Sequence, residues 1–104
     1  MDFSADELHQ ELARFDATMA RVVGRAGDGA DLVLDRLLST HVRLLRLMLD
    51  EDGGNAAMDA ADAACRAMDA ADPAAPLLML AMARATLAAK VRRQATRARG
   101  LRAA

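Results

Sequence analysis

The stretch that decides the fold is residues 30–50, which read ADLVLDRLLSTHVRLLRLMLD. On a helical wheel, five polar side chains crowd into a sector of about 100°, and they are Asp35, Arg36, Ser39, Arg43 and Arg46. Nearly every other position is Leu, Val or Met, so the apolar face is wider than half of the circumference. Because one neighbouring helix cannot cover such a face, we expect this helix to be both the central helix of the fold and a self-association surface. The residues expected at that oligomer interface are Leu37, His41, Leu44, Leu45 and Met48.

A helix is predicted to precede this stretch, beginning after Ser4. The sequence Ser4-Ala5-Asp6-Glu7 forms a capping box, and Phe3 can pack on Leu8 across the first turn. Apolar residues then recur at intervals of three or four, which places them in one narrow stripe: Leu8, Leu12, Phe15, Met19 and Val22. This helix is expected to end at the glycines between residues 24 and 29, where Asp28 or Asp31 can cap the next helix.

Two further helices are predicted downstream. Residues 50–54, DEDGG, are expected to break the chain, so that Asn55 caps a third helix that ends near Ala71. Most positions of this third helix are Ala, which allows another helix to approach closely, and one side carries Met58, Ala61, Cys65 and Met68. A neighbouring stripe is charged and consists of Asp59, Asp62, Arg66 and Asp69. The turn at residues 72–76 leads to a fourth helix. Its apolar residues keep heptad spacing, interrupted by Arg84 and Gln94, and they are Leu77, Leu80, Leu87, Val91, Ala98 and Leu101.

Composition agrees with an all-helical chain. The 104 residues include 26 Ala but no Ile, Trp or Tyr and only four Thr, so residues that favour strands are scarce. Four helices joined by short breaks predict an all-α fold, either a four-helix up-and-down bundle or two stacked helical hairpins, completed by oligomerisation. We expect residues 1–91 to form the bundle domain and residues 92–104 to form a basic C-terminal helical extension.

Charge is strongly segregated along the chain. All 15 acidic residues lie between Asp2 and Asp72, whereas residues 73–104 hold seven basic residues and no acid. The bases near the C-terminus are predicted to contact nucleic acid without sequence preference, because no aromatic residue is available to stack on the bases of the nucleic acid. The alternative is an acidic protein partner, or pairing with the third helix or with residues 50–52 of a neighbouring subunit. The residues concerned are Lys90, Arg92, Arg93, Arg97, Arg99 and Arg102.

No catalytic, metal or cofactor site is predicted. His41 lies midway along a helix, as in histidine phosphotransfer domains, but it sits near the centre of the apolar arc, whereas a phosphoacceptor must face solvent. A buried, neutral histidine is therefore the preferred interpretation. His9, His41 and Cys65 lie on three different helices, so no pair of metal ligands shares one helical face. Cys65 shares its stripe with methionines and is expected to be a small buried residue.

The sequence predicts a cytoplasmic protein without a membrane span. A single cysteine cannot form an internal disulfide, and the first residues do not resemble a signal peptide. The longest apolar run, residues 77–83, is far shorter than the roughly 20 residues that a bilayer requires. Binding to a membrane surface is less favoured, because the most apolar part of the last helix precedes the basic part instead of lying opposite it. Abundant Ala and Arg are typical of a GC-rich genome, such as that of a bacterium or phage.

These features predict a non-enzymatic, self-associating helical adaptor or assembly protein. Small helical subunits of DNA-packaging or particle-assembly machinery have this general character. Two alternatives stay open. One is a small helical chaperone or regulator of a protein partner, and the other is a histidine phosphotransfer protein that uses His41.

Overall fold

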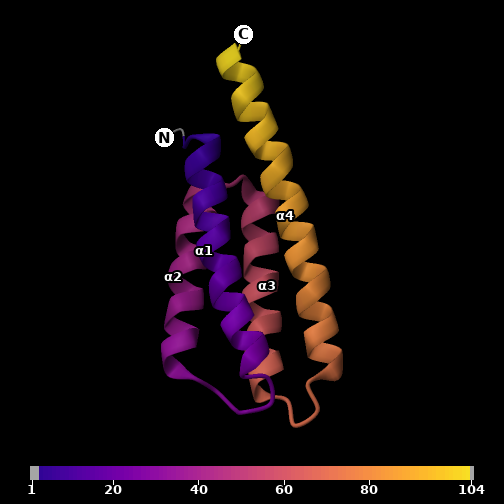
Figure 1. The fold of residues 1–104 in the computed structure, drawn as a ribbon. Coiled ribbons are helices and arrows are strands. Elements are labelled where there is room, and N and C mark those ends of the chain that lie inside the picture. Colours follow the sequence, from indigo (N-terminus) through magenta and orange to yellow (C-terminus); the bar gives the residue numbers. More distant parts are fainter. Residues whose placement is uncertain (1–2, 104) are drawn as a thin grey trace.

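The computed structural model describes the backbone of residues 3–103 and the side chains of residues 3–100. Successive helices run in opposite directions and are joined by short loops (Figure 1), and the described residues contain no strand. The predicted all-α class is confirmed. The helices are α1 (Ala5–Gly24), α2 (Leu32–Met48), α3 (Glu51–Asp69) and α4 (Ala74–Ala103).

The first two helices begin where side-chain caps are predicted. The Ser4 hydroxyl accepts a hydrogen bond from the Glu7 amide at 3.0 Å, as the capping box requires. Asp31, one of the two candidates, caps α2 by accepting from the Leu34 amide at 3.1 Å. Each cap satisfies a backbone N–H group that has no partner within the helix.

The third helix begins earlier than predicted. Asn55 is not its cap; Asp50 is, because its carboxylate accepts from the Gly53 amide at 2.8 Å. Gly53 and Gly54 lie buried inside the first turns instead of breaking the chain. A Cβ atom on Gly53 would lie 3.0 Å from the Cβ atom of Leu49, and one on Gly54 would lie 3.2 Å from Cγ of Arg46. These glycines therefore let the start of α3 approach the end of α2 closely.

Helices α1 and α3 each pack against the other three helices, so the expectation that α2 is the central helix was wrong. Helix α3 packs against α1, α2 and α4, whereas α2 packs against α1 and α3 and does not reach α4 in the described part of the chain. The buried face of α3 consists mainly of small side chains, which let three helices converge on it: Ala56, Ala57, Ala60, Ala63, Ala64 and Ala67. The larger side chains of the core come chiefly from the other helices: Phe15, Met19, Leu38, Leu45, Leu80 and Leu87.

The last helix is the longest and extends beyond the other three (Figure 1). Its 30 residues span about 45 Å at the usual helical rise, and the molecule measures 51 × 23 × 20 Å. The helix continues without a break through the boundary predicted between residues 91 and 92. Ala95, beyond that boundary, is still buried. Packing against the bundle therefore continues into the predicted extension.

By length and hydropathy alone, the segment Ala74–Gly100 of α4 is long and apolar enough to cross a membrane. Here it packs on α1 and α3 and buries Leu80, Leu87 and Val91. Its Arg84 side chain forms an ion pair with Asp16 of α1 at 3.4 Å. One face of this helix therefore belongs to the bundle core, and the absence of a membrane span stays a prediction.

Candidate functional site

A polar cluster lies inside the contact between α1 and α2. The Thr18 hydroxyl and Nε2 of His41 form a hydrogen bond at 3.0 Å, and Nδ1 of His41 lies 3.6 Å from a carboxylate oxygen of Glu11. The centroids of the Phe15 and His41 rings are 5.8 Å apart. The bond between Thr18 and His41 joins the two helices, whereas Nδ1 of His41 has no hydrogen-bond partner among the described residues.

Access to this cluster is closed. A carboxylate, an imidazole and a hydroxyl in this order can also activate a nucleophile. Thr18 is only 5% exposed and the His41 side chain only 11%, so no substrate reaches the hydroxyl unless α1 and α2 separate. The same shielding, together with the bond from Nε2 to Thr18, leaves phosphotransfer through His41 without a structural argument in its favour.

Sequence reasoning missed Glu11 as a buried residue. Its second carboxylate oxygen lies 3.8 Å from the Arg14 guanidinium and has no hydrogen-bond partner among the described residues. The sequence signal for its burial was its position, because Glu11 follows Leu8 by three residues and precedes Phe15 by four. That spacing places it on the apolar stripe of α1.

The predicted oligomer interface on α2 is divided between core and surface. Leu45 is fully buried within its own chain, and Leu37 and Met48 pack against the core while partly buried. His41 contacts Thr18 of α1. Leu44 alone of the five is classed as exposed, at 42%. Much of the wide apolar face of α2 is therefore already covered by α1 and α3.

A groove of about 800 Å³ lies between α2 and α3. Its apolar lining comprises Leu38, Val42, Leu47, Met58, Ala61 and Cys65. Its polar lining comprises Asp35, Ser39, Arg43, Arg46 and Asp62. An apolar floor with charges of both signs suits an amphipathic helix of another protein.

The thiol in this groove is not a reactive one. Burial raises the pKa of Cys65 to about 11, and the nearby Asp35 carboxylate, which accepts a hydrogen bond from the thiol at 3.4 Å, contributes to the increase. The attacking species in thiol chemistry is the thiolate, which is scarce at neutral pH for such a group. Cys65 is partly buried, and its surroundings do not support a nucleophilic role.

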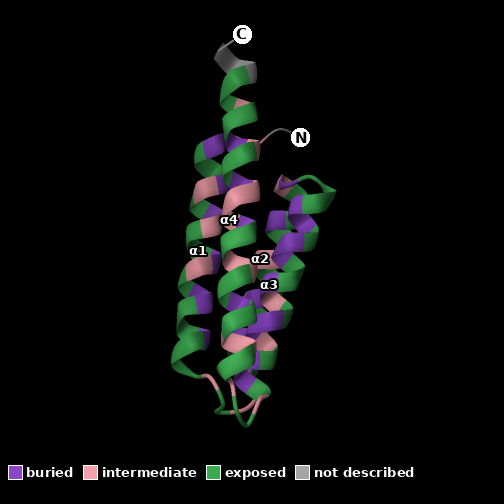
Figure 2. Cartoon of the chain, turned by 90° about the vertical axis from the view of Figure 1, so that its right-hand side faces the viewer, coloured by how far each residue is buried: buried purple, intermediate pink, exposed green. Residues whose placement is uncertain are grey.

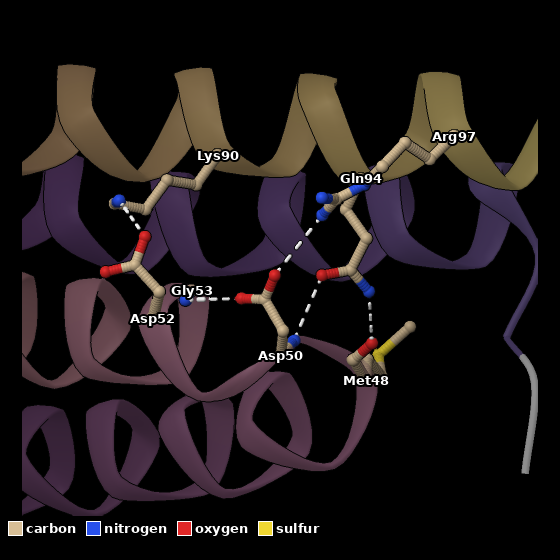
Figure 3. Close-up of polar contacts among 7 residues, drawn as sticks. All are labelled: Met48, Asp50, Asp52, Gly53, Lys90, Gln94 and Arg97. Carbon is tan, nitrogen blue, oxygen red and sulfur yellow. Dashed lines mark hydrogen bonds and ion pairs between the residues drawn. The ribbon is translucent and has the colours of Figure 1, made fainter.

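Helix α4 holds the loop between α2 and α3 (Figure 3). The Gln94 amide donates to the backbone carbonyl of Met48 at 2.8 Å and accepts from the backbone amide of Asp50 at 3.0 Å. Arg97 forms an ion pair with Asp50 at 3.2 Å, and Lys90 forms one with Asp52. In the sequence, Gln94 is notable only because it interrupts the heptad of apolar residues. That polar residue was the signal for its contact with the loop.

This arrangement also explains the electrostatics of the loop. The pKa of Asp50 lies below its ordinary value, chiefly because its carboxylate accepts from the Gly53 amide. The charges of Arg97 and Lys90 add to this effect. One alternative predicted from the sequence is that the basic residues pair with residues 50–52 of a neighbouring subunit. Arg97 and Lys90 instead form these pairs within one chain.

The remaining bases lie at the far end of α4. Arg92 and Arg93 are exposed and form no ion pair with any described side chain. Arg97 and Arg99 are exposed as well, and Arg99 lies 3.8 Å from the Asp6 carboxylate. The side chain of Arg102, also predicted to bind, lies outside the described residues. We call the described set the basic end, and it consists of Arg92, Arg93, Arg97 and Arg99.

Among the described residues, no group of three or more His, Cys, Asp or Glu side chains is placed to hold a metal ion. The features that could carry function are thus the basic end, the groove between α2 and α3, and the outer face of α4. No family model matches the chain, and neither a curated protein nor a solved structure matches it.

Proposed function

We propose that this chain is a non-enzymatic, self-associating adaptor or assembly protein whose basic end binds a polyanion. The polyanion is a nucleic acid or an acidic segment of a partner protein. The observation that carries the proposal is the basic end itself, because four exposed arginines gather between residues 92 and 99 of α4, beside the α2–α3 loop and the start of α1.

Two of these arginines are available without breaking any contact. Arg92 and Arg93 have no acidic partner among the described side chains. Arg97 and Arg99 pair with exposed carboxylates, and exposed ion pairs contribute only about 0–1 kcal/mol. They can therefore exchange Asp50 and Asp6 for a phosphate or for a carboxylate of a partner at little cost.

Recognition by this surface is expected to be independent of sequence. Arginine contacts with phosphate give an affinity that falls as salt rises, and they carry no base information. The chain has two aromatic residues, both Phe, and Phe15 is fully buried in the core. None of the residues of the basic end is aromatic, so these residues offer no platform on which bases could stack.

The test is a titration of labelled duplex DNA, in two unrelated sequences, followed by fluorescence anisotropy over a range of salt. We expect equal affinities for the two sequences. Arg92→Gln combined with Arg93→Gln should weaken binding at least tenfold at low salt. It should also reduce the slope of log affinity against log salt by about 2, at about 0.9 per phosphate.

The matched control removes two arginines elsewhere. Arg21→Gln combined with Arg36→Gln changes the net charge equally, and both residues are exposed on other helices. This control should bind nearly as tightly as the wild type. Equal losses in both double variants would contradict a site at the basic end. The same titration with a polyglutamate peptide in place of DNA tests whether the basic end binds an acidic segment of a partner protein.

A second function, as a chaperone or regulator of a protein partner, is favoured by the groove between α2 and α3. Its apolar lining includes Met58, which is exposed on α3. Met58→Arg would fill the groove and block a partner helix. The same change should leave DNA binding intact, so this variant separates the two functions.

A further inference from the structure

The outer face of α4 is apolar along the first half of the helix. Leu78, Met79 and Met82 are 64%, 51% and 63% exposed. Between Ala74 and Ala89 the helix has one charged residue, Arg84, and this side chain turns toward Asp16 of α1. Exposed residues follow the near side of α4 in Figure 2. We call this face the apolar strip, and it consists of Ala75, Leu78, Met79, Met82 and Ala85.

We propose that the apolar strip binds a second copy of the chain, with the two α4 helices antiparallel and Met82 at the two-fold axis. This inference rests on the self-association that the proposed function includes, and it assigns that self-association to α4 instead of α2. Exposed clusters of large apolar side chains are typical of sites that another surface covers. A two-fold axis lets one such strip serve as both halves of the contact.

Side-chain size favours this register. With Met82 opposite its own copy, Leu78 lies opposite Thr86 of the second copy, and Met79 lies opposite Ala85. Large side chains thus meet small ones on both sides of the axis, which allows two helices to interlock. The contact between Ala75 and Ala89 closes each end, and the segment from Ala75 to Ala89 spans about 21 Å at the helical rise.

Charge decides the direction of the second helix. Arg92 lies ten residues after Met82, about 15 Å along α4, and Asp72 lies in the turn two residues before α4 begins, at the other end of the apolar strip. An antiparallel pair therefore brings Arg92 and Arg93 of one copy to the level of Asp72 of the other. A parallel pair would place the arginines of both copies side by side, where they repel each other.

The carboxylates of Asp69 and Asp72, near the start of α4, strengthen this charge complementarity. Asp69 lies near Asp72 at the end of α3, and neither forms an ion pair with a described side chain. The same carboxylates argue against an anionic lipid surface as the occupant, because such a surface would repel one end of the strip. A second copy offers each end of the strip the opposite charge.

The first experiment measures molar mass by sedimentation equilibrium, from micromolar to the highest soluble concentration. The wild type should approach the mass of a dimer, and Met82→Asp should remain a monomer with an unchanged circular dichroism spectrum. Leu44→Asp, which alters the exposed residue among the five predicted at the α2 interface, should dimerise like the wild type. Dissociation by Leu44→Asp but not by Met82→Asp would overturn the α4 interface and leave self-association intact.

A second experiment tests direction by disulfide trapping in a Cys65→Ser background. Met82→Cys should cross-link to itself on oxidation. Ala75→Cys and Ala89→Cys should cross-link only when the two variants are mixed. Self-cross-linking of Ala75→Cys would show a parallel pair and overturn the proposal.

The remaining outcomes separate this inference from the proposed polyanion binding. A wild type that stays monomeric at every concentration overturns the inference, whatever the DNA titration gives. Vesicles of phosphatidylcholine and phosphatidylserine provide the last arm. Monomers that bind them in a manner abolished by Met82→Asp would assign the strip to lipid and overturn the dimer.

Discussion

Helices α2 and α3 reverse the usual relation between apolar content and burial. Helix α2 has seven leucines, of which Leu34, Leu38 and Leu45 are buried, and it packs against two neighbours. Helix α3 has no leucine and seven alanines, six of which are buried, and it packs against all three other helices. The comparison teaches that small side chains let α3 lie close to three neighbours, whereas α1 meets the same number of neighbours with large side chains such as Phe15 and Met19.

The comparison can be tested first within α2, where we expect the largest effect. Leu45→Ala removes a fully buried side chain and should lower the free energy of unfolding by about 2–5 kcal/mol. Leu47→Ala, two residues away and exposed, should change it by less than about 0.5 kcal/mol. Urea denaturation followed by circular dichroism measures both. Similar losses in the two variants would mean that α2 is covered on both sides.

The converse test enlarges a small residue of α3. Ala64→Leu adds three carbon atoms at a fully buried position and should lower the free energy of unfolding by about 1–3 kcal/mol through overpacking. Ala13→Leu, on the exposed face of α1, is the control and should be nearly neutral. A stabilised Ala64→Leu protein would show that α3 has unfilled space around it.

A third prediction concerns the polar cluster between α1 and α2. Thr18→Val keeps the shape of the side chain and leaves Nε2 of His41 without its partner, which should cost about 1–3 kcal/mol. Thr96→Val, at an exposed position of α4 outside the apolar strip, should have little effect. The two unfolding curves give the difference directly. Equal stability of both variants would indicate that water replaces the Thr18 hydroxyl.

The fourth prediction is a pH dependence at the start of α3. The lowered pKa of Asp50 means that its stabilising contribution is present above its unfolded value of about 3.8. That contribution is lost as the pH falls through the lower pKa of the folded state. Asp50→Asn should therefore be less stable than the wild type at pH 7 by a small amount, and the difference should shrink toward pH 3. Thermal unfolding at the two pH values measures it.

The smallest expected effect is on Cys65. With a pKa of about 11, the thiol should react slowly with iodoacetamide at pH 8 in the folded protein and much faster in urea. Asp35→Asn should accelerate the reaction of the folded protein, because it removes the carboxylate next to the thiol. The unfolded thiol ionises at lower pH, so this group stabilises the fold below about pH 9 and loses that contribution as the pH approaches 11.

Much of the local structure was predictable because it depends on neighbours in the chain. The capping box at Ser4, the cap at Asp31 and the apolar stripe of α1 follow from contacts within one or two helical turns. The segregation of charge that defines the basic end is also a property of the sequence. The cap at Asp50 was missed because Gly53 and Gly54 resemble a break until the packing partner is known.

The sequence by itself determined the all-helical class, the number of helices and the polarity of each helical face, since these depend on propensity and on the helical period. Only the tertiary structure decided which faces meet. It packed α1 and α3 against all the other helices, buried Leu45 instead of leaving it for a second copy, and joined Gln94 to the distant loop at Asp50. The physical reason is that burial depends on distances between helices, which side-chain volume sets and which no single helical pattern contains.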